Sequence, residues 1–371
     1  MSVDLDDPGL QAPPDSPNGH VELAPMRPGA LRWNDVAIFL GAAVSSLSLV
    51  WLVYERLAPT SGALGFLICW VLTFLLVYWI VVREVDGPLV ATDKLVAVGI
   101  GIVAVGLLVP LVSILVYIIY QGLHALTVGF FLRDMTGISP QQPASAGGAA
   151  HAIVGSLEQV GLALVISVPI GITAAVYMNE VRGRMTRAVR TFVNAMSGVP
   201  SIVAGLFIYA IWLLQFHHSF SGFAAALALS ILMLPTVART AEEVLRLVPD
   251  GLREASLALG SPEWRTTWSV VLPTARSGLV TAVILGMARA VGETAPLIMT
   301  SFGTQTMNWN PFSGAQQSLP LFVWQQYQLG GGAVGTPGFL RAFTGAFALI
   351  MVVLILFVIA RLFGRSKFSS R

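Results

Sequence analysis

One polar stretch decides how this chain is organised: residues 254–273, which read Glu-Ala-Ser-Leu-Ala-Leu-Gly-Ser-Pro-Glu-Trp-Arg-Thr-Thr-Trp-Ser-Val-Val-Leu-Pro. The stretch lies between two long apolar segments. Residues 254–259 favour a helix and Gly260 is a helix stop, while Ser261 and Pro262 supply an N-cap and a first-turn proline for a second helix. We therefore predict two short helices joined at Gly260. A short rigid element of this kind is suited to pass a domain motion to the attached segments.

The rest of the chain has the composition of a membrane protein. Of its 371 residues, 55% are hydrophobic and 11% are charged, with a mean hydropathy of +0.77. Soluble proteins carry about 25% charged residues. The net charge of +2 and the lack of a basic cluster with interleaved aromatics argue against nucleic-acid binding. Cys69 is the only cysteine, so an intrachain disulfide is excluded.

The first 34 residues differ from the remainder, because prolines and aspartates dominate them. They hold too few apolar residues to offset the entropy of ordering, so we expect a disordered cytoplasmic tail over 1–34. The acidic start and the late first apolar run do not fit a signal peptide. We divide the remainder into two N-terminal transmembrane helices over 35–94 and a transmembrane domain over 95–371, which includes a cytoplasmic loop over 250–273.

Eight apolar stretches have about the 20 residues that a helix needs to cross a bilayer core of about 30 Å. The lipid core cannot hydrogen-bond exposed backbone groups, so these stretches should be helices and the fold class all-α and polytopic. The stretches are 36–54, 63–82, 95–120, 152–179, 190–214, 222–239, 276–300 and 339–361.

Basic residues set the orientation of the spans. With the N-terminus inside, seventeen lysines and arginines fall on the cytoplasmic side and three on the outer side, Arg56, Arg133 and Arg341. This bias places 254–273 and the C-terminus in the cytoplasm. Two nearly uncharged segments, 121–151 and 301–338, then lie outside; they either meet an extracytoplasmic partner or only connect spans.

Two ionisable residues at membrane depth indicate function. Such groups cost about 2.5–3.5 kcal/mol or more each. Arg289 and Glu293 share one span at an i, i+4 spacing, so they can pair and leave guanidinium donors for an anion. The alternative is a structural ion pair without a substrate role. Arg239 near the inner end of another span is a further path candidate, with interfacial snorkelling as its alternative.

Other residues within the spans predict packing. Glu158 and Gln159 are unusual in lipid and should face protein. Small residues recur every four positions in the span that holds Arg289, a pattern that lets helix backbones approach closely, either within this chain or with a partner subunit. They are Gly278, Ala282, Gly286 and Ala290.

Several familiar sites are absent from the sequence. A phosphate-cradling loop needs Gly-Lys-Ser/Thr, but Lys94 follows Asp93 and Lys367 follows Ser366. The chain therefore lacks that ATP site, so any ATP-driven step would need a separate ATPase. Metal binding is not expected, since the adjacent His217 and His218 have no third ligand in view.

Four stretches carry a resemblance. Residues 254–273 are similar to the ATPase-docking loop of ABC importer permeases, E-A-A-x3-G-x9-I-x-L-P, with Ser and Val replacing one Ala and the Ile. Residues 239–249 (RTAEEVLRLVP), 197–207 (SGVPSIVAGLF) and most specifically 288–297 (ARAVGETAPL) resemble the PstA-type permease of the bacterial phosphate-specific ABC importer. The two N-terminal spans depart from that pattern.

The resemblance implies a function and its partners. It implies a six-span permease core that pairs with a PstC-type permease, a PstB-type ATPase dimer that binds ATP and Mg, and an extracytoplasmic phosphate-binding protein. This chain itself would bind no cofactor and would be a multi-pass subunit of the bacterial cytoplasmic membrane that imports phosphate by alternating access. Arg289, Glu293 and Arg239 would line the path; the coupling residues would be Glu254, Ala255, Gly260, Leu272 and Pro273. Alternatives are a permease for another oxyanion, or a phosphate-status sensor or scaffold that uses the N-terminal helices.

Overall fold

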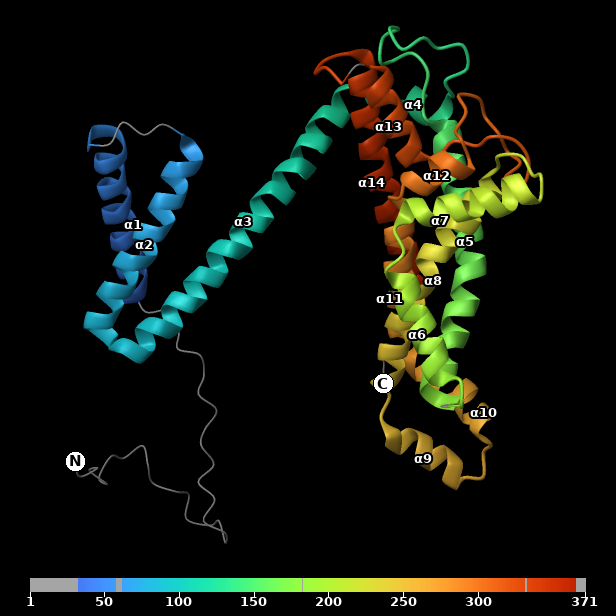
Figure 1. Ribbon diagram of the computed structural model, residues 1–371, viewed down its shortest axis with the longest axis horizontal. Helices are drawn as coiled ribbons and strands as arrows, with labels where there is room; N and C mark the ends of the chain where they lie inside the picture. The colour runs from blue at the N-terminus through green and yellow to red at the C-terminus, as the bar shows by residue number, and fades with distance from the viewer. Residues whose placement is uncertain (1–32, 58–61, 182, 331, 365–371) are drawn as a thin grey trace. The chain divides into compact units, whose positions relative to one another are not determined.

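The computed structural model describes residues 33–57, 62–181, 183–330 and 332–364, which form helices joined by turns and loops (Figure 1). Residues 1–32 of the predicted tail lie outside the described part. The chain divides into two compact units, Met1–Val112 and Ser113–Arg371, with the boundary inside the long helix α3 (Pro88–His124). The division predicted between residues 94 and 95 rests on the sequence pattern and stays a prediction.

The N-terminal unit holds α1 (Trp33–Trp51), which continues as a π-helical turn η1 (Leu52–Leu57), then α2 (Ala63–Asp86) and the first part of α3. Phe39 of α1 packs edge-on against Phe74 and Tyr78 of α2, with ring centroids 5.2 and 5.9 Å apart. Lys94 of α3 pairs with Asp35 of α1 at 2.5 Å and with Asp86 of α2 at 2.8 Å. These contacts join the three helices of this unit.

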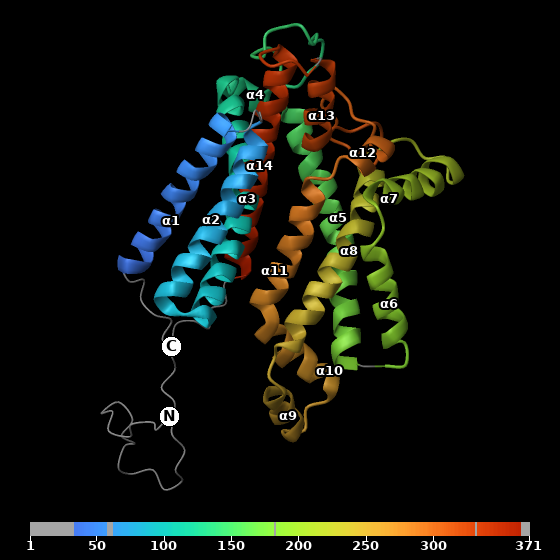
Figure 2. The same ribbon diagram turned by 60° about the vertical axis from the view of Figure 1, so that its left-hand side comes forward.

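The second unit is a helical bundle with short helices at both ends. Figures 1 and 2 show α5, α8, α11 and α14 running alongside one another, with α9 and α10 at one end and α4 and α13 at the other. Its elements are α4 (Val128–Leu132), α5 (Ala150–Val176), η2 (Tyr177–Val181), α6 (Thr186–Ser197), α7 (Ser201–Ile208), η3 (Tyr209–Gln215), α8 (Gly222–Arg246), α9 (Asp250–Ala258), α10 (Glu263–Thr266), η4 (Thr267–Val271), α11 (Leu272–Val291), α12 (Ala295–Thr300), α13 (Leu319–Leu329) and α14 (Pro337–Gly364).

Within the described residues, seven helices are long and apolar enough to cross a membrane, and a bent pair makes up to eight. This confirms an all-α polytopic fold. Two spans differ from prediction. The stretch 190–214 is two helices, α6 and a segment over 201–215, that meet at 103°, because Pro200 has no N–H and restricts the residue before it. The span predicted over 276–300 ends at Val291, and α12 starts after a short turn.

The small-residue stripe of α11 packs against α8 of the same chain. A Cβ on Gly286 would come within 2.7 Å of Val237, and one on Gly278 would overlap Val244. Ala282 and Ala290 are fully buried in the same interface. The predicted close helix approach is therefore confirmed, and its partner is a helix of this chain.

Candidate functional site

The two path candidates with positive charge lie on facing helices. Arg289 of α11 donates from Nη1 to the hydroxyl of Thr236 on α8, at 3.3 Å. Arg239 follows Thr236 by three residues on α8, which places the two on one side of that helix. Both arginine side chains are exposed within this chain. Arg289 thus contacts α8 at Thr236, and Arg239 lies about one turn further along α8, with both guanidinium groups exposed.

The i, i+4 spacing predicted that Glu293 lies on the same helical face as Arg289. In the structure it does not. α11 ends at Val291 with Gly292 as its C-cap, and Glu293 lies in the turn before α12. Among the described residues, no ion pair joins Glu293 to Arg289. The expected pairing is therefore not formed in this structure, because the helix stops before its register would bring the two side chains together.

Two of the four stretches that carry the family resemblance contact each other in the structure. Gly205 of α7 lies so close to α12 that an added Cβ would stand 2.6 Å from the Cα of Pro296. Gly205 belongs to the stretch 197–207 and Pro296 to the stretch 288–297. The bend after α6 brings α7 to this position, so the turn that carries Glu293 ends in a helix packed against α7.

The loop 254–273 forms two short helices, as predicted. Gly260 joins α9 to α10 with a φ of +82°, a left-handed conformation that glycine adopts without steric cost. α10 begins at Glu263 after Pro262, so Ser261 is not the residue that caps it. Glu254 and Ala255 are exposed on α9, while Leu272 and Pro273 form the first turn of α11.

Large apolar side chains are exposed on this element. Leu259 is 87% exposed, and Trp264 and Trp268 are each 72% exposed. Large exposed apolar groups on a short polar element are typical of surfaces that contact a protein or a membrane. The whole element lies at one end of the bundle in both ribbon views (Figures 1 and 2).

Arg253 fixes α9 to the bundle, a role that the sequence reasoning missed. Its Nε and Nη2 donate to the two carboxylate oxygens of Glu180 in η2, at 3.0 and 2.8 Å. The remaining donors reach the carbonyls of Leu245 and Val248 and the carboxylate of Asp250, at 2.9, 2.7 and 2.9 Å. The hydrogen bonds that Arg253 donates to the Glu180 carboxylate raise the pKa of Arg253 above its ordinary value. The partner lies 73 residues away in the chain, so no local pattern reveals this pair.

A second buried carboxylate holds the same end of the bundle. Glu242 of α8 accepts from Arg190 of α6 at 2.6 Å and from Arg246 at 2.5 Å. In the sequence, Arg190 and Arg246 are noticeable only as two of the seventeen basic residues predicted on the cytoplasmic side. The ion pairs join α6 to α8 near the start of α9.

At the opposite end, a buried amide cluster confirms that Gln159 faces protein. Gln159 of α5 donates to the side-chain oxygen of Gln316 at 3.2 Å, and Gln316 donates to Glu158. Gln317 donates to Gln325 of α13 at 2.8 Å. The segment 301–318 therefore folds back onto α5 and is more than a connecting loop, although its contact with a partner stays a prediction.

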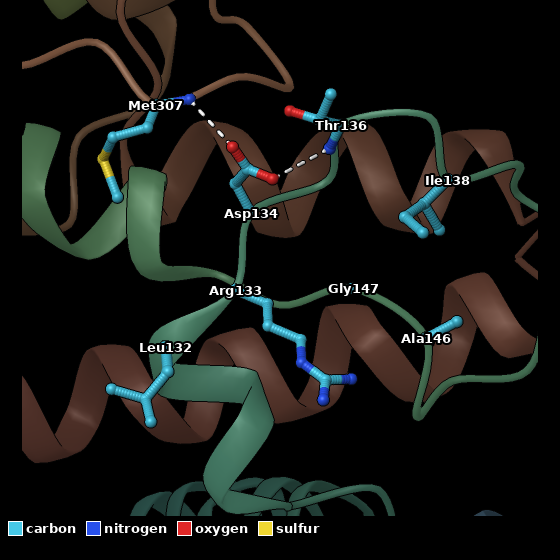
Figure 3. A pocket seen from close by; sticks show the side chains of 8 residues that line it. All are labelled: Leu132, Arg133, Asp134, Thr136, Ile138, Ala146, Gly147 and Met307. Atoms are coloured by element: carbon cyan, nitrogen blue, oxygen red, sulfur yellow. Dashed lines mark hydrogen bonds between the residues drawn. The ribbon is translucent and has the colours of Figure 1, made fainter.

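The segments 121–151 and 301–338 also form a pocket of about 530 Å³, lined by Arg133, Asp134 and Met307 among others (Figure 3). The backbone N–H groups of Thr136 and Met307 each donate to the carboxylate of Asp134 at 3.1 Å. Although burial opposes ionisation, these hydrogen bonds hold the pKa of Asp134 below its ordinary value. Asp134 thus ties the segment after α4 to the segment after α12.

Arg341 was counted as an outer-side charge and is instead almost completely buried, at 1% exposure. Its guanidinium donates to the carbonyls of Ser139, Gln142 and Pro143, at 3.4, 2.9 and 2.9 Å. The first turn of α14 therefore holds the loop 139–143 in place.

Comparisons with known proteins show the family of this chain. Residues 167–368 match the model of the binding-protein-dependent transport system inner membrane component. The chain belongs to this family. Within it the chain is a PstA-type permease, and it is a transport component of an ABC importer that works with partner subunits.

Its curated relatives carry the PstA name. The chain is 44% identical over 248 residues to "Phosphate transport system permease protein PstA 1" of Mycobacterium tuberculosis (strain CDC 1551 / Oshkosh), covering 66% of this chain and 80% of the relative. It is 36% identical over 287 residues to "Phosphate transport system permease protein PstA" of Pasteurella multocida (strain Pm70), covering 77% and 96%.

Solved structures of ABC importers also align with this PstA-type permease. The inward-facing MetNI methionine ABC transporter gives a TM-score of 0.44 at 22% identity and covers 58% of this chain and 94% of that chain. An amino acid ABC transporter crystallised with histidines gives 0.42 at 18% identity, covering 64% and 99%.

Proposed function

We propose that this chain is the permease subunit of an ATP-driven importer of inorganic phosphate in a bacterial cytoplasmic membrane. The observation that carries the proposal is the 44% identity to a phosphate transport system permease over 80% of that relative's length. The names of the relatives supply the substrate.

The proposal includes a set of partners. A PstC-type permease completes the translocation path, a PstB-type ATPase dimer binds ATP and Mg, and a phosphate-binding protein delivers substrate from outside. The exposed element 254–273 is the surface on which the ATPase docks. Its polar edge at Glu254 and its exposed Leu259 and Trp264 suit a partner that offers both charge and apolar contacts. In this orientation both chain ends lie in the cytoplasm.

Within the chain, Arg289 and Arg239 line the phosphate path. Two guanidinium groups on one interface favour an anion by charge and offer several donors to its oxygens. Glu293, in the turn next to Arg289, limits the positive charge at that level of the path. This role replaces the direct ion pair that the sequence suggested.

The test is uptake of labelled phosphate by the complete complex in proteoliposomes, with the binding protein outside and ATP on the ATPase side. We expect ATP-dependent uptake that excess sulfate does not reduce. Uptake that sulfate competes away, or none at all, would overturn the assignment of phosphate.

A second experiment tests the docking surface. Replacing Glu254 by Lys should abolish ATP-coupled uptake while the chain still inserts into the membrane, because the charge at the ATPase contact is reversed. Normal uptake by Glu254→Lys would refute the coupling role of this residue.

A further inference from the structure

The docking helix α9 is held to the bundle mainly by polar contacts. None of the residues of α9 is buried. The hydrophobic cluster beneath it, which includes Leu245, Val248 and Val271, has no member from α9. Because no residue of α9 joins this cluster, hydrophobic packing contributes little to its position, and its placement depends on specific side-chain links.

Two side chains on the inner side of α9 supply those links. The hydroxyl of Ser256 lies 2.9 Å from that of Thr266, which joins α9 to α10. Arg253 makes the connection to the bundle. Guanidinium has five N–H donors, and here all five have acceptors.

The acceptors of Arg253 belong to different elements. Glu180 lies in η2, which continues α5; Leu245 lies in the last turn of α8; Val248 lies in the turn before α9. The pair is largely withdrawn from solvent, at 16% side-chain exposure for Arg253 and 9% for Glu180. A two-point Arg–carboxylate contact fixes orientation as well as distance, and it loses little to screening by salt when it is buried.

We propose that Arg253 and Glu180 form a strut that transmits movement of α9 to the ends of α5 and α8. They are positioning residues for ATP-coupled transport, because they act through the helices and do not touch phosphate. α8 also carries Thr236 and Arg239, so a displacement of its end reaches the proposed path. The inference rests on the proposed function, since it requires an ATPase bound to the exposed face of α9, away from the bundle.

The experiment compares coupling in reconstituted complexes that contain Arg253→Lys or Glu180→Gln. Lysine lacks the planar fork and glutamine lacks the charge, so each breaks the two-point contact with a small change in volume. We expect phosphate transported per ATP hydrolysed to fall about tenfold or more, while subunit assembly and ATP hydrolysis remain. ATP hydrolysis should also become less dependent on the loaded binding protein.

Matched controls are available on the same side of the bundle. Arg187 and Glu243 are exposed and make no ion pair within the part of the chain that the structure describes. Arg187→Lys and Glu243→Gln make the same chemical changes without touching the strut. Both should keep the wild-type ratio of transport to hydrolysis.

Cross-linking separates a strut from a merely structural contact. Cys69 is the only cysteine, so Cys69→Ser gives a cysteine-free background. Glu180→Cys with Arg253→Cys in that background should couple poorly, and a bifunctional thiol reagent that spans the pair should restore coupling. Restored coupling is not expected from either single cysteine.

The possible outcomes are distinguishable. If the wild type imports no phosphate, the proposed function fails, and the strut is judged on whether the variants release ATP hydrolysis from control by the binding protein. If the wild type imports phosphate and the variants keep its transport-to-hydrolysis ratio, the strut is wrong while the function stands. Should Glu180→Gln fail to assemble, Arg253→Lys and the cross-linked pair decide the matter.

Discussion

Replacing Arg289 by Ala tests the proposed path with little risk of unfolding. Arg289 is exposed, and among the residues that the structure describes it makes one hydrogen bond, to Thr236 at 3.3 Å. A single hydrogen bond of this kind contributes about 1 kcal/mol to stability or less. Arg289→Ala should therefore fold and assemble, and any large effect on uptake reports on the substrate.

The expected effect follows from the charge. Two unit charges 4 Å apart interact with about 1 kcal/mol in water and about 4 kcal/mol at an effective dielectric of 20. A partly hydrated path lies between these limits, and each 1.4 kcal/mol corresponds to a factor of about ten. We expect Arg289→Ala to lower phosphate uptake about tenfold to a hundredfold.

The assay is labelled phosphate uptake by assembled complexes in proteoliposomes. Arg289→Lys keeps the charge and should retain more activity than Arg289→Ala, while Thr236→Val removes only the hydrogen bond and should have a small effect. Arg187→Ala, which removes an exposed charge from α6, is the control. If Arg289→Ala imports phosphate as well as this control does, the path through Arg289 is refuted.

Three further predictions concern folding. Gly155→Ala should lower the free energy of unfolding by about 1–3 kcal/mol, because its Cβ would overlap the carbonyl of Gln317; Gly161→Ala on the same helix has open space around it and should be neutral or slightly stabilising in thermal melts. Arg341→Lys should release the loop 139–143, since an ammonium group cannot reproduce the guanidinium fork that reaches three carbonyls. Limited proteolysis should then cut this loop faster than in the wild type. Equal cleavage would contradict the proposed role of Arg341 in holding the loop. The lowered pKa of Asp134 means that its ionised form stabilises the fold above about pH 4, and that this contribution is lost as the pH falls through the lower folded-state pKa. Melting temperature in Asp134→Asn should accordingly depend less on pH below about pH 4 than in the wild type, and parallel curves would refute the role of the carboxylate.

Hydropathy predicted most of the spans because span length depends on a simple sum over residues. The same sum contains no information about the direction of the helix axis. It therefore predicted one continuous span across Pro200 and missed the 103° bend that separates α6 from α7. It also predicted a continuous helix across Gly292, whereas α11 ends just before this residue. In both places a proline or glycine interrupts an apolar run without making it polar.

The candidate site was only partly visible in the sequence. Arg289 and Arg239 stood out because charge is rare at membrane depth, and the two short helices around Gly260 followed from local turn chemistry. Arg253 and Glu180 did not stand out, because each is an ordinary charged residue near a span end and their contact forms only when α5 and α9 meet. Arg341 looked like a surface charge for the same reason: the carbonyls that hold it lie about 200 positions earlier in the chain.

The two-sided character of α9 has a consequence for how such importers diversify. Arg253 and Ser256 attach the helix to its neighbours, whereas Glu254 and Leu257 of the helix and Leu259 at its C-cap are exposed. Substitutions on the outer side can therefore accumulate with almost no folding penalty as long as the inner two residues persist. On the proposed docking role of α9, exchanging its exposed residues between two importers should change which ATPase each permease binds.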